Sequence, residues 1–163
     1  GNVSAGLPFW KNFYAGGPQS VRGFEANTLG PSYGNCLPIP PETTCTPSYL
    51  QPLGGAVKVA GSFEFLFPRL FSKARGTRLS AFIDYGNVYA GSLDDIYSNY
   101  TNPVTGTVYN TEKFSLSTLR VSTGVALKWQ APVGPISISY AFPFNTTDFD
   151  RTESLQFTFG QTF

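Results

Sequence analysis

The chain is 163 residues long, enough for one domain. Charged residues make up 13% of it, about half of the ~25% usual in a soluble domain. Lys and Arg number 11 and Asp and Glu number 10, so the net charge of +1 argues against a nucleic-acid-binding surface. His is absent, which excludes His-based catalytic triads and the usual zinc sites.

Aromatic residues make up 16% of a chain whose mean hydropathy is close to zero. This combination indicates apolar and polar residues in alternation, which is typical of β-structure. No segment supplies the ~20 apolar residues that a membrane-spanning helix needs. The chain begins at Gly1 without a signal peptide, so we expect it to be a portion of a longer protein.

Cys36 and Cys45 lie in a polar, Pro-rich stretch that we interpret as a loop. Their spacing suits a disulfide that closes a small loop in an oxidising compartment. Two free thiols are the alternative. A metal site would need further ligands, so none is expected.

From residue 54 onward, apolar and polar residues alternate in five segments. Because strand side chains have a period of two, Phe63 and Phe65 should face one side and Glu64 the other, and Asp84 should share the side of Glu64. Residues 91 to about 115 are polar and are predicted to form a long loop. The predicted strands are 54–67, 78–90, 117–130, 135–144 and 154–163.

These strands are long, and the connections between them alternate between long and short, as in outer-membrane barrels. We therefore predict an all-β fold, a meander of antiparallel transmembrane β-barrel strands with two free edges. The apolar faces should point outward together, and Glu64, Asp84, Arg120 and Ser139 should share the other face. A soluble β-sandwich or lipocalin-type barrel is the alternative. Five strands are too few to close a barrel, since single-chain barrels start at about eight.

Residues 8–31, which read PFWKNFYAGGPQSVRGFEANTLGP, resemble the sixth external loop of the BamA family of outer-membrane protein assembly factors. The motif is Val21, Arg22, Gly23 and Phe24. The downstream segments SFEFLFP, FIDYGNVY and LQFTFGQTF match the last strands of that family in order. The resemblance implies that residues 1–53 are the sixth external loop, folded into the barrel. It also implies that 54–163 are the last five strands of a sixteen-stranded barrel whose POTRA domains lie elsewhere.

In that family the motif arginine meets acidic residues of the barrel wall, and the matching positions here are Arg22, Glu64 and Asp84. A guanidinium holds carboxylates in a bidentate fork, which Lys does not. Gly23 should allow a tight turn, and Phe24 should pack against the wall. A purely structural clip and a mechanistic element both remain open at this point.

The other charged residues give no catalytic constellation. Arg78 and Arg120 are expected to line the channel, and Asp94, Asp95, Asp148 and Asp150 to be solvated loop charges. We expect no enzyme activity, no cofactor and no metal site.

The resemblance implies assembly and insertion of β-barrel proteins at the outer membrane of a Gram-negative bacterium. The implied partners are outer-membrane lipid, nascent β-barrel clients and, through the POTRA domains, assembly-complex lipoproteins; strand-edge self-association is a further expectation. A secretion pore of the two-partner type, a translocation module and a passive porin are the alternatives. The implied mechanism uses a weakly paired seam between the first and last strands of the barrel. The residues assigned to the seam strand and the C-terminal signal are Leu155, Phe157, Phe159, Gly160 and Phe163.

Overall fold

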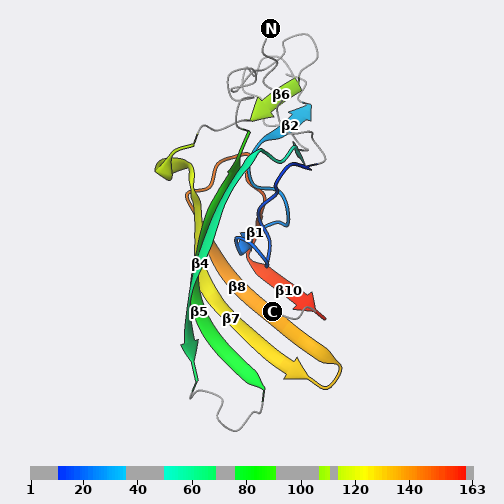
Figure 1. Cartoon of the computed structure of the whole chain (residues 1–163), viewed down its shortest axis with the longest axis vertical. Helices are drawn as coiled ribbons and strands as arrows, with labels where there is room; N and C mark the ends of the chain where they lie inside the picture. The colour runs from blue at the N-terminus through cyan, green and yellow to red at the C-terminus, as the bar shows by residue number, and fades with distance from the viewer. Residues whose placement is uncertain (1–10, 36–49, 69–75, 91–106, 111–113, 161–163) are drawn as a thin grey trace, which may run out of the picture.

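The computed structural model describes residues 11–35, 50–68, 76–90, 107–110 and 114–160 (Figure 1). Its main feature is a five-stranded antiparallel sheet in the order β10-β8-β7-β5-β4. This is the meander predicted from the alternation, with no crossover between strands. The strands are β4 (Val57–Phe67), β5 (Thr77–Tyr89), β7 (Arg120–Ala131), β8 (Gly134–Phe144) and β10 (Leu155–Phe159).

The strand register collects the apolar side chains on one face, which we call the outer face. One row across the sheet runs Phe65, Ala81, Val125, Tyr140 and Leu155. Phe65 is 67% exposed and Leu155 is 62% exposed. Within the described residues these side chains are not packed into a core, as a soluble sandwich would require. The outward-facing apolar set is therefore confirmed, and Phe63, Trp129 and Phe142 belong to it.

The opposite face, which we call the inner face, carries small and polar side chains. Its members at the centre of the sheet are buried, and they are Ser80, Phe82, Asp84, Ser122, Ala126, Ser139 and Ala141. The segment before β4 covers them, and its short strand β1 (Gly23–Phe24) contacts β8 (Figure 1). A small apolar core forms there from Ala15, Val21, Phe24, Leu29 and Val88. Residues 15–29 are thus held against the inner face.

Shorter strands complete the fold. β1 pairs with β9 (Thr152–Glu153), and β2 (Ser32–Asn35) lies between β3 (Leu50–Pro52) and β6 (Thr107–Asn110). The prediction of a continuous loop over 91–115 was wrong at β6, because backbone pairing with β2 fixes four residues that carry no alternation signal. A 3₁₀ turn, η3 (Leu116–Thr118), delays the start of β7 beyond the predicted residue 117.

Some of the expected features lie outside the described residues. These are Cys36, Cys45, Asp94, Asp95 and Phe163. None of the helical segments in the described part of the chain is long and apolar enough to cross a membrane. Strands β4 and β10 form the two ends of the sheet, and each has one hydrogen-bonded neighbour in it.

Candidate functional site

Arg22 binds Asp84 through both its side chain and its main chain. The guanidinium donates from Nε to Oδ2 at 2.7 Å and from Nη2 to Oδ1 at 2.8 Å. The backbone N–H of Arg22 also donates to Oδ2, at 3.1 Å. Only 1% of the Asp84 side chain is exposed, so the pair is shielded from water. The bidentate contact expected from the motif is present, and Lys could not reproduce it.

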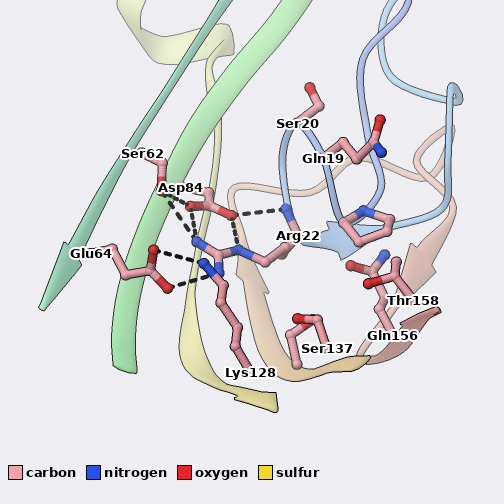
Figure 2. A pocket seen from close by; sticks show the side chains of 12 residues that line it. Gln19, Ser20, Arg22, Ser62, Glu64, Asp84, Lys128, Ser137, Gln156 and Thr158 are labelled. Carbon is pink, nitrogen blue, oxygen red and sulfur yellow. Dashed lines mark hydrogen bonds and ion pairs between the residues drawn. The ribbon is translucent and has the colours of Figure 1, made fainter. Parts of the chain in front are cut away.

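Glu64 holds a second, more open position in the same cluster (Figure 2). Its carboxylate lies 3.8 Å from Nη1 of Arg22 and 3.1 Å from Nζ of Lys128, and it also accepts a hydrogen bond from Ser80. Glu64 therefore belongs to the Arg22 cluster, and it forms a closer ion pair with Lys128 than with Arg22. Alternation places Lys128 on the same face as Glu64 but does not identify it as a partner.

Phe82 lies directly under the guanidinium, whose central carbon is 3.5 Å from the ring centroid. A cation over an aromatic face is attracted by the ring quadrupole. Phe82 sits between Ser80 and Asp84 on the inner face, and Gly124 leaves room for its ring, since a Cβ there would come within 2.8 Å of the ring edge. Alternation placed Phe82 on this face but could not identify it as part of the site.

Gly23 brings the motif backbone into contact with the wall. Its φ is +90°, and a Cβ at this position would lie 3.0 Å from the Cβ of Ala141 and 3.4 Å from that of Ser122. Both the backbone conformation and the close approach call for glycine. The neighbouring motif residues Val21 and Phe24 have no exposed surface and belong to the small core.

The motif also lies beside the chain that leads into the last strand. Gly23 pairs with Glu153 and Phe24 with Thr152. The backbone carbonyl of Phe24 accepts a hydrogen bond at 2.7 Å from Nε2 of Gln156, which is 3% exposed. Sequence reasoning missed Gln156 as a site residue, although its inward position in a strand of outward-facing aromatics was a usable signal.

Below the motif lies a polar cavity of about 370 Å³ on the inner face. Arg22, Glu64 and Asp84 line one side of it, and Gln156 and Thr158 line the other (Figure 2). No three His, Cys, Asp or Glu side chains of the described chain lie where they could share a metal ion. The chemistry on view is ion pairing and hydrogen bonding between loop and wall.

Arg120 and Asp150 were expected to be separate, a channel lining and a solvated loop charge. The structure corrects this, because Nε of Arg120 lies 2.6 Å from Oδ2 of Asp150 with 4% and 5% of the two side chains exposed. Oδ2 also accepts from the backbone N–H of Thr147. The loop after β8 folds back over the start of β7, a contact that alternation within strands does not reveal.

Three residues assigned to the seam strand, Leu155, Phe157 and Phe159, lie on the outer face and are exposed. The strand ends at Phe159, because Gly160 has a φ of +76°. Gly160 still donates a backbone hydrogen bond to Pro135, at 2.9 Å. The change of backbone direction at Gly160, more than a missing side chain, marks the end of the strand.

Comparison with known proteins agrees with this architecture. The family model of the Omp85 superfamily domain matches residues 1–163. The chain is 40% identical over 167 residues to the outer membrane protein assembly factor BamA of Neisseria meningitidis serogroup B, covering 96% of this chain and 19% of that protein. A SAM50-like protein of Schizosaccharomyces pombe is 29% identical over 91% of this chain and 26% of its own length.

A solved structure also matches, the crystal structure of BamA from Haemophilus ducreyi lacking POTRA domains 1–3. It superposes with a TM-score of 0.67 and 28% identity, over 92% of this chain and 27% of that one. The chain thus spans about a fifth to a quarter of the length of the relatives it matches. On the match of the whole chain to the family model, this protein belongs to the Omp85 superfamily.

Proposed function

We propose that this chain is the C-terminal part of the barrel of an outer-membrane protein assembly factor in a Gram-negative bacterium. The observation that carries the proposal is the motif loop held on the inner face by Arg22 and Asp84, in a chain 40% identical to Neisseria BamA. In this proposal residues 1–53 are an in-folded external loop, and 54–163 are the last strands of a larger barrel. The outer face then contacts lipid.

The proposed activity is insertion of nascent β-barrel proteins without catalytic chemistry. Strand β10 lies at the end of the sheet, and one of its two edges has no partner strand in the described residues. Unpaired backbone N–H and C=O groups are costly in lipid and form a template for an incoming strand. A client strand would pair with this edge, and β10 is only five residues long, which keeps the pairing exchangeable. The partners are client barrels, lipid and the assembly lipoproteins that contact the remainder of the protein.

The test is reconstitution of the full-length protein that carries this segment into lipid vesicles. An unfolded β-barrel client is added, and folding is followed by the appearance of protease-resistant client. We expect faster folding than in empty vesicles and in vesicles that hold a passive porin at equal mass. Folding at the rate of empty vesicles would contradict the proposal, and solute conductance or export of a soluble substrate in its place would favour a pore.

A further inference from the structure

Gln156 lies at the junction between the motif and the last strand. Its Nε2 donates to the carbonyl of Phe24 at 2.7 Å, while its Oε1 has no hydrogen-bond partner among the described residues. A buried amide with one half unsatisfied is uncommon, since buried polar groups are usually paired. The half that is used is the donor: its short hydrogen bond is to main chain of the motif, and a longer one, at 3.4 Å, is to Oε2 of Glu153, which pairs with Gly23. The geometry gives the donor a definite role.

Backbone pairing strengthens the same junction. Beyond the β1–β9 pairs, the N–H of Glu25 donates to the carbonyl of Arg151 at 2.8 Å, and the side chains of Glu25 and Arg151 form an exposed ion pair. The residues that follow the motif arginine therefore run alongside the residues that lead into β10. This pairing covers residues 151–153, immediately before the strand begins.

The other end of the motif is fixed far away in the sheet. Arg22 is bound to Asp84 on β5, and β7 and β8 lie between β5 and β10 in the strand order. Two consecutive parts of one loop thus contact non-neighbouring strands: the Arg22 side chain holds β5, and the Phe24 carbonyl holds β10. Figure 2 shows the contact between Arg22 and Asp84, and it shows Gln156 on the opposite side of Arg22 from Asp84.

We infer that Gln156 is a positioning residue that ties the last strand to the motif, so that the loop acts as a strut between β5 and β10. The strut holds the base of β10 to the wall while its free edge exchanges partners. The link to partner exchange rests on the proposed function; the strut itself does not. Because β10 is short and is paired with β8 alone among the described strands, this extra attachment matters more than it would for a central strand.

The first experiment is hydrogen–deuterium exchange of the full-length protein in detergent or lipid discs. Gln156→Met keeps the volume and loses both polar groups, whereas Gln156→Glu keeps an acceptor and loses the donor. In both variants we expect the amides of 155–159 to exchange about tenfold faster, with those of β5 and β7 unchanged. The matched control is Thr158→Val, because Thr158 is on the same face and strand and makes no side-chain hydrogen bond to the described residues. Unchanged exchange in Gln156→Glu would overturn the inference, since packing alone would then explain the site.

The second experiment tests the coupling between the two ends. Arg22→Ala should also accelerate exchange in 155–159, and the double variant Arg22→Ala, Gln156→Met should exchange no faster than the faster single variant. Multiplicative effects would show two independent contacts and would overturn the strut. Client folding in vesicles is scored separately, with the unsubstituted protein. If Gln156→Met exchanges fast but the unsubstituted protein does not accelerate client folding, the strut stands and the proposed function is overturned. If Gln156→Met exchanges at the normal rate and the unsubstituted protein accelerates client folding, the strut is overturned and the proposed function stands.

Discussion

Gly23 lies so close to Ala141 that a Cβ on the glycine would approach the Ala141 Cβ to 3.0 Å. Gly23→Ala therefore adds a clash to the cost of a left-handed backbone at φ +90°. We expect the free energy of unfolding to fall by about 2–5 kcal/mol, the sum of ~1–2 for the backbone and ~1–3 for overpacking. The measurement is the temperature at which the folded band is lost in semi-native electrophoresis.

Gly160 supplies the matched control for this prediction. Its φ is +76°, but a Cβ there would meet no atom of the described residues within 4 Å. Gly160→Ala should therefore cost only the backbone term of ~1–2 kcal/mol. Equal effects at Gly23 and Gly160 would show that contact with the wall contributes nothing.

Arg22→Ala should be more damaging than Arg22→Lys. Removing the guanidinium leaves the buried carboxylate of Asp84 without this counter-charge, which costs about 3–5 kcal/mol of stability. Lys restores the charge but offers no fork, so it should recover about half of the loss. Protease sensitivity of residues 11–35 measures loop release directly. Arg22→Ala with Asp84→Asn should recover part of the stability, because the unpaired charge is then gone; no recovery would contradict a role for the charge.

The two ion pairs near the end of the chain should differ in strength. Asp150→Asn removes a buried carboxylate that pairs with Arg120 and should cost about 3–5 kcal/mol. Glu25→Gln breaks the Arg151 pair, whose side chains are 41% and 43% exposed, and should cost at most ~1 kcal/mol. Thermal unfolding of the two variants in the same detergent compares them. A larger loss in Glu25→Gln would contradict the burial argument.

Charge on the two faces of the sheet should have opposite consequences. Val125 is mid-strand on the outer face and 49% exposed, so Val125→Arg should place a cation in lipid and cost about 2–4 kcal/mol. Ser137 lines the polar cavity on the inner face, and Ser137→Arg should be tolerated. Yields of correctly folded protein in isolated outer membranes distinguish the two. Equal tolerance would contradict the assignment of the outer face to lipid.

Cys36 and Cys45 are predicted to form a disulfide. Labelling of the denatured, unreduced protein with a thiol reagent should detect no free thiol, and reduction should release two. In the chain-entropy model the closed loop stabilises the protein by about 2–3 kcal/mol. Two labelled thiols before reduction would show that the disulfide is absent.

The alternation of side chains predicted the strands, their order and both faces, because a period of two is read directly from residues such as Phe63, Glu64 and Phe65. It also placed Asp84 and Glu64 on one face, and the resemblance then supplied Arg22 as their partner. What it could not supply were contacts between different kinds of segment. The pairs Arg120–Asp150 and Gln156–Phe24 join residues 30 and 132 positions apart. Such contacts depend on how loops fold back on the sheet, and loops carry no periodic signal.

The small core of Val21, Phe24, Leu29 and Val88 lies on the inner face, which in the proposed barrel is filled with water. On the outer face, lipid tails are as apolar as the side chains. Packing these side chains against one another therefore gains little hydrophobic free energy. In the described chain, the hydrophobic effect therefore stabilises the packing of the loop residues Val21, Phe24 and Leu29 against the inner face. Such packing needs paired strands but no bilayer. It also weakens on cooling, so a larger share of the loop's stability at low temperature comes from the Arg22 ion pair and from the hydrogen bonds to β9 and Gln156.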